Sequence, residues 1–72
     1  MKKLPRLSGK KLIKILSKIG FESVRQRGSH IFLRHLDCRT TVVPNHKEID
    51  RGTLLEIIRQ IKLSKKEFID LL

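Results

Sequence analysis

The stretch that decides the fold is residues 21–43, FESVRQRGSHIFLRHLDCRTTVV. It holds three short runs with the residue types of β-strands, separated by Arg27-Gly28 and Asp37-Cys38, two-residue segments that suit hairpin turns. The runs are Phe21–Gln26, Ser29–Leu36 and Arg39–Val43. We therefore predict a three-stranded antiparallel meander.

The middle run does not reveal which of its side chains share a face of the sheet. Ile31, Phe32 and Leu33 are consecutive apolar residues, so the alternation of a half-buried strand is interrupted. Pro44 ends the third run, because proline cannot donate to a strand ladder, and residues 45–49 are typical of a loop.

A helix is predicted on the N-terminal side of the meander, over Gly9–Ile19. Its apolar residues recur at helical spacing, Ser8 is suited to the N-cap, and Gly20 stands where a helix favours a left-handed residue. The apolar residues are Leu12, Ile15, Leu16 and Ile19. On the polar side, Lys10, Lys14 and Lys18 repeat every four residues and form either a solvated face or a ridge that contacts RNA.

A second helix, Arg51–Ile61, is predicted after the loop, with Asp50 as its N-cap. We expect its buried side to comprise Leu54, Leu55, Ile58 and Ile61. Ser64 and Glu67 then form a capping-box pattern that opens a short terminal helix with Phe68, Leu71 and Leu72.

The order helix, three strands, helix and short helix predicts an α+β fold. Residues 1–72 are expected to form one domain, a two-layer sandwich in which both main helices cover one face of the sheet. This is the architecture of double-stranded-RNA-binding domains.

Charge points to a polyanionic partner. Seventeen Lys and Arg oppose seven Asp and Glu, for a net charge of +10, and residues 1–34 carry a net +9 against +1 for residues 35–72. Concentrated positive charge is what phosphate-backbone binding uses, which favours RNA. A merely soluble surface is the plain alternative. An anionic membrane fits less well, because the basic helix has an ordinary core stripe and no aromatic residue.

The expected location is the cytoplasm. Cys38 is the one cysteine, which excludes an internal disulfide, and the apolar runs, three residues at most, are too short for a signal peptide or a membrane span.

His30, His35 and His46 are the side chains whose ordinary pKa lies nearest neutrality. The sequence lacks metal-ligand spacing and clustered acids, so we expect no metal and no cofactor. No nucleophile elbow surrounds Ser29 or Cys38, and Cys38 is most simply a turn residue.

Metal-free RNA cleavage needs neither a metal site nor a protein nucleophile. RNA carries its own nucleophile, the 2′-hydroxyl, so a histidine that moves protons and cations that hold the phosphate suffice. His30 follows Arg27, Gly28 and Ser29, which supply charge, a close-approaching backbone and a hydroxyl. An ordinary strand residue is the alternative interpretation of His30.

The chain resembles the HicA toxins, the mRNA interferases of toxin–antitoxin pairs. The resemblance covers nearly the whole chain and is carried by short motifs. These are Ser8-Gly9, residues 12–16, Gly20-Phe21, Arg25, Gly28-Ser29-His30, Pro44-Asn45-His46, Gly52-Thr53-Leu54 and Glu67-Phe68. It implies a fold like that of a double-stranded-RNA-binding domain, an endoribonuclease that inhibits translation, His30 as the catalytic residue, and a HicB-like antitoxin as partner.

The candidate site around His30 contains substrate-binding residues from three regions: Arg27, Gly28, Ser29, Lys10, Lys14 and His46. His46 is either a second proton-transfer group or an RNA contact, or a loop residue with no role. His35 is left out, because five residues separate it from His30 and a regular strand turns it to the opposite face. A non-catalytic RNA-binding module and a protein-interaction module remain the rival functions.

Overall fold

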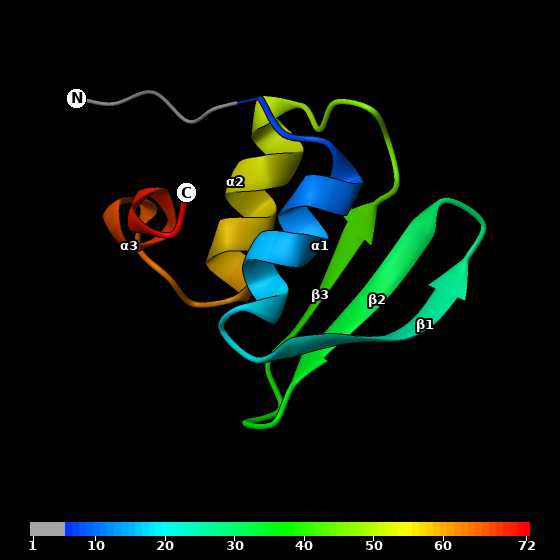
Figure 1. The fold of residues 1–72 in the computed structure, drawn as a ribbon, viewed down its shortest axis with the longest axis horizontal. Coiled ribbons are helices and arrows are strands. Elements are labelled where there is room, and N and C mark those ends of the chain that lie inside the picture. The colour runs from blue at the N-terminus through cyan, green and yellow to red at the C-terminus, as the bar shows by residue number, and fades with distance from the viewer. Residues whose placement is uncertain (1–5) are drawn as a thin grey trace.

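The computed structural model describes residues 6–72 and confirms the predicted α+β fold (Figure 1). The elements follow in the expected order: α1 (Gly9–Ser17), β1 (Phe21–Arg27), β2 (His30–His35), β3 (Thr40–Pro44), α2 (Arg51–Gln60) and α3 (Lys65–Asp70). Bounds differ from the predicted ones by one or two residues at most ends, within the usual fraying of element termini.

The three strands form one antiparallel sheet in the order β1-β2-β3. Arg27 pairs with His30, so the first hairpin turn consists of Gly28 and Ser29, one residue later than predicted. Gly28 adopts a φ of +58°, the left-handed conformation that such turns require. Cys38 has a φ of +77° in the second turn, which confirms it as a turn residue.

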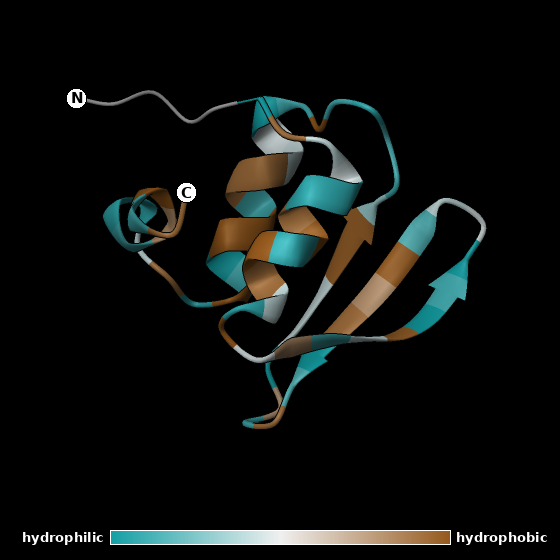
Figure 2. Ribbon diagram, viewed as in Figure 1, coloured by the Kyte–Doolittle hydropathy of each residue, from teal (hydrophilic) through white to brown (hydrophobic). Residues whose placement is uncertain are grey.

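Helices α1 and α2 lie side by side on one face of the sheet (Figure 1). Their apolar sides and the helix-facing side chains of the strands form the core (Figure 2). The buried apolar residues are Leu7, Leu12, Ile15, Leu16, Phe21, Ile31, Leu33, Val43, Ile49, Leu54, Ile57, Ile58, Ile61 and Phe68. The hairpin of β1 and β2 extends beyond the helix layer, and of β1 only Phe21 is buried.

Helix α1 ends at Ser17, two residues before the predicted end. Its last turn tightens, because Lys18, Ile19 and Gly20 donate their backbone N–H groups to carbonyls three residues back. Gly20 then turns the chain into β1 with a φ of +102°, as its position predicted. The N-cap is confirmed at Ser8, whose hydroxyl accepts from the Lys11 N–H at 3.1 Å.

The caps of the other two helices are confirmed as well. Asp50 accepts hydrogen bonds from both the side chain and the backbone of Thr53, which hold the pKa of Asp50 below its ordinary value. Ser64 and Glu67 form the reciprocal capping box of α3. Phe68 is the one fully buried side chain of α3 and anchors this helix to the core.

The buried side of α2 corrects one prediction. Leu54, Ile58 and Ile61 are buried as expected, but Leu55 is 39% exposed and Ile57 takes its place in the core. Residues 54, 57, 58 and 61 follow the i, i+3, i+4, i+7 pattern of one helix face, and Leu55 lies at its margin. Across residues 6–72, no helix has the length and apolar character needed to cross a membrane.

Adjacent leucines of α2 test this assignment. We expect Leu54→Ala to lower the free energy of unfolding by about 2–5 kcal/mol, because Leu54 is 1% exposed and its truncation leaves a cavity. Leu55→Ala should cost less than about 1 kcal/mol. Urea titrations that keep a common slope would measure both, and a Leu54→Ala chain unfolded in buffer would also agree. Equal losses would contradict the orientation of α2.

Candidate nucleic-acid interface

The first hairpin turn places the proposed catalytic residue at one end of the sheet. His30 opens β2 directly after the turn of Gly28 and Ser29, and its cross-strand neighbours are Arg27 on β1 and Pro44 on β3. His30, Ser29 and Arg27 are all exposed. Directly opposed residues of antiparallel strands have Cβ atoms about 5 Å apart, so the Arg27 side chain starts beside the imidazole.

Strand β2 alternates after all, which the run of three apolar residues had concealed. Ile31 and Leu33 are buried against the helices, whereas His30 and Arg34 are exposed and Phe32 is half-buried on the opposite face. We call this opposite side, which carries the side chains at positions 30, 32 and 34, the outer face of the sheet. His30 therefore points away from the helix layer.

The loop after β3 connects the hairpin turn to the start of α1. The Asn45 N–H donates to the Ser29 carbonyl at 2.6 Å, and the His46 N–H donates to the Pro44 carbonyl at 2.9 Å. On its other side, the His46 carbonyl accepts from the Gly9 N–H at 2.9 Å. Backbone hydrogen bonds thus gather three segments that are far apart in the sequence.

Gly9 makes this junction possible. A Cβ atom at Gly9 would clash with the Pro44 carbonyl oxygen and would lie 3.0 Å from the Asn45 Cα. Both are backbone atoms, which cannot swing aside as the end of a side chain can. The start of α1 therefore sits against the loop more closely than any other residue type would allow.

Lys10 and Lys14 project from α1 into solvent, as the sequence predicted. Lys10 directly follows Gly9 and so belongs to the same end of the molecule as the loop, and Lys14 lies about 6 Å further along the helix axis. The first turn of α1 holds no acidic residue, so the positive end of the helix dipole is not neutralised there. In the described part of the chain, Lys10, Lys14 and Arg27 form no ion pairs.

His35 is a structural residue on the helix-facing side, opposite to His30 as expected. Its Nε2 lies 2.9 Å from the Ile19 carbonyl, and its Nδ1 accepts from the Asp37 N–H at 3.1 Å. Its ring also meets Phe21 edge to face at 5.1 Å. His35 thereby joins the end of α1 to the second hairpin turn.

Two features of the outer face were missed by sequence reasoning. Phe32 lies on the same face as His30, and Arg25 is its neighbour on β1, with the guanidinium carbon 6.0 Å from the ring centroid. The separation of two residues between His30 and Phe32 was the available signal.

Over residues 6–72, no three His, Cys, Asp or Glu side chains lie close enough together to hold a metal ion.

Comparison with known proteins identifies the chain's relatives at the level of the family. The model of a family described as "HicA toxin of bacterial toxin-antitoxin" matches residues 9–63, about three quarters of the chain. None of the curated proteins compared matches it. The matched region spans α1 to α2 and includes the hairpin turn, the loop after β3 and the start of α1.

Two glycines in the first turns of helices test the junction. Gly52→Ala should change the free energy of unfolding by less than about 1 kcal/mol, because the helix preference of alanine opposes a mild contact of its Cβ with the capping oxygen of Asp50, at 3.3 Å. Gly9→Ala should instead cost about 1–3 kcal/mol, since backbone must move. Thermal unfolding followed by circular dichroism compares them. A Gly9→Ala protein as stable as Gly52→Ala would disprove the close contact.

Proposed function

The chain belongs to the HicA toxin family, whose members act in toxin–antitoxin systems, and we propose on that premise that it is an endoribonuclease. Its substrate is mRNA, its location is the cytoplasm, and it inhibits translation by cleaving mRNA without a metal ion. The observation that supports this best is the placement of His30, exposed beside Arg27 at the end of the hairpin.

The reaction uses the nucleophile that RNA supplies. The 2′-oxygen attacks the adjacent phosphorus, the bond from phosphorus to the 5′-oxygen breaks, and the products carry a 2′,3′-cyclic phosphate and a 5′-hydroxyl. His30 either takes the proton of the 2′-hydroxyl or gives one to the departing 5′-oxygen. Arg27 stabilises the charge that builds up on the phosphorane, because cations placed where charge develops lower the barrier most.

The other site residues hold the substrate. The turn of Gly28 and Ser29 leaves backbone open to the RNA, since nothing lies within 4 Å of the position where a Gly28 Cβ would stand. Lys10 and Lys14 bind phosphates beyond the reacting one. His46 belongs to the loop bonded to this turn and is the candidate for the second proton-transfer group.

An antitoxin partners each toxin of such a pair, and we expect it here to be a HicB-like protein with an acidic surface. The cations near His30 lack carboxylate partners among the described residues of this chain. A single acidic interface over His30 would therefore match the charge and block access to the reacting group together.

Replacing His30 tests catalysis directly. His30→Ala should reduce cleavage about 10²- to 10⁴-fold, the usual loss when a general acid or base is removed, while RNA binding persists because the cations remain. Gel analysis of RNA treated with each protein measures this, and a chelator should not protect the RNA from the unmodified protein. Growth arrest on expression should disappear with the activity.

His46→Ala tests the second candidate proton-transfer group in parallel, and circular dichroism shows whether both variants fold. A folded His30→Ala protein that cleaves at the original rate would remove His30 from the mechanism. Loss of activity only in His46→Ala would move the site to the loop, and cleavage by neither protein nor its parent would favour a non-catalytic RNA-binding module.

Charge reversal tests the role of α1. RNA affinity should fall on the order of a hundredfold or more from low to physiological salt. In a chain with Lys10→Glu and Lys14→Glu, the slope of log affinity against log salt should be shallower by about 1.4, two phosphate contacts at about 0.7 each. Lys65→Glu with Lys66→Glu on α3 changes the net charge equally and is the control. An equal effect of both pairs would show that only total charge matters.

A further inference from the structure

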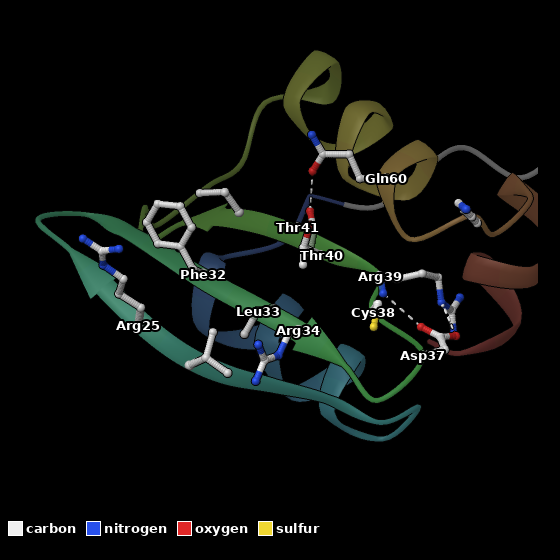
Figure 3. Close-up of a pocket in the computed structure, with 13 residues that line it drawn as sticks. Arg25, Phe32, Leu33, Arg34, Asp37, Cys38, Arg39, Thr40, Thr41 and Gln60 are labelled. Atoms are coloured by element: carbon white, nitrogen blue, oxygen red, sulfur yellow. Dashed lines mark hydrogen bonds and ion pairs between the residues drawn. The ribbon is translucent and has the colours of Figure 1, made fainter.

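The outer face of the sheet combines an aromatic ring with cations (Figure 3). Helix α1 lies behind the sheet, and Arg25, Phe32 and Arg34 stand on the viewer's side. A hollow of about 820 Å³ opens to solvent here and also reaches Thr41 and Gln60 on the helix side of β3. The residues that line it include the apolar side chains of Val24, Phe32 and Val42. Val24 is 51% exposed, and Phe32 and Val42 are half-buried, so three apolar side chains reach solvent at this hollow.

The strand register arranges the outer face in rows across the sheet. One row consists of Arg27, His30 and Pro44, and the next consists of Arg25, Phe32 and Val42. Two residues along a strand separate the rows, which corresponds to about 7 Å. The ring of Phe32 therefore lies one row from the proposed catalytic histidine, on the same face.

Charge on this face favours an anion. Arg25 lies beside the ring, and Arg34 follows Phe32 two residues along β2. Asp37, which borders the hollow, is occupied by Arg39, whose side chain donates to it at 2.8 Å and holds its pKa below the ordinary value. Glu22 stands opposite Arg34 on β1, but among the described residues neither Arg34 nor Arg25 forms an ion pair, so the net charge around the ring is positive.

We propose that this face binds unpaired RNA, with one base stacked on Phe32 and the flanking phosphates held by Arg25 and Arg34. An aromatic ring set in a positively charged surface is how proteins hold single-stranded nucleic acid, because every base offers a flat face. The proposal rests on the proposed function and deepens it, since it makes single-stranded RNA the substrate class and Phe32 a positioning residue. In a duplex the bases are stacked inside and cannot reach the ring.

An acidic protein segment is the other occupant that the cations would attract. It would use the arginines but gain nothing specific from a ring placed one row from His30. A base next to the reacting phosphate would use both. RNA therefore fits the arrangement better, and the experiment includes the acidic segment as a competing outcome.

The chain contains no tryptophan, so one introduced tryptophan can report binding by its fluorescence without background. Phe32→Trp introduces a single indole on the outer face, and Leu55→Trp introduces one on α2 as the matched control. The probe is a 2′-O-methyl RNA oligonucleotide without secondary structure, which cannot be cleaved by attack of its own 2′-oxygen. Stacking should quench the fluorescence at position 32 and leave that at position 55 unchanged.

Affinity measurements complete the test. By fluorescence anisotropy of a labelled probe, Phe32→Ala and Phe32→Leu should bind about five- to a hundredfold more weakly, the range for loss of one base–aromatic stack, and Phe32→Trp should bind as well as the parent. Leu55→Ala is the control, and circular dichroism verifies folding. A duplex probe should bind without any dependence on position 32.

The outcomes separate this proposal from the endonuclease. Cleavage of unmodified RNA that does not depend on Phe32, with unchanged affinity, would overturn the stacking platform and leave the nuclease intact. Quenching by the oligonucleotide from a protein that cleaves nothing would support the platform and remove the nuclease. Quenching by poly-glutamate but not by RNA would assign the face to an acidic protein, and Phe32-dependent binding of duplex would refute the preference for unpaired RNA.

Discussion

The approach of backbone to backbone at Gly9 is the constraint on which the remaining architecture of the site depends. With no side chain at this residue, the first turn of α1 packs against Pro44 and donates a hydrogen bond to the His46 carbonyl. The same loop donates to Ser29 in the hairpin turn. Helix, loop and hairpin therefore hold one another in place through main-chain atoms, so the side chains of this surface are free to contact other molecules.

Local signals in the sequence were enough for the elements and their order. Ser8, Asp50 and Ser64 each satisfy backbone N–H groups at a helix start, and Gly20 has the positive φ that its position implied. These features depend on neighbours a few residues away, so a linear pattern records them. Leu55 was misplaced although the pattern was available, because Leu54, Ile57, Ile58 and Ile61 have helical spacing, whereas Leu55 directly follows Leu54 and lies about 100° round the helix from it.

The surface itself was only partly predictable. Parity along β2 correctly separated His30 from His35, since side chains alternate in any regular strand. The cross-strand pairs could not be predicted from this alternation, because they depend on the register between neighbouring strands. The register between β1 and β2 shifts between Ser23 and Arg25, and no pattern in the sequence predicted this bulge. Arg25 and Phe32 lie between this shift and the turn, so the turn of Gly28 and Ser29, one residue later than predicted, sets their pairing.

In the projecting hairpin, the residues at the proposed site contribute little to the stability of the core. Of the seven residues of β1, only Phe21 is buried, so changes at Arg25 or Arg27 remove little from the core. In evolutionary terms, the strand that borders the proposed site can drift without a stability threshold to restrain it. The hairpin of such a toxin can therefore change its contacts with an antitoxin, or with the RNA that we propose it binds, while α1, α2 and the helix-facing side of the sheet stay the same.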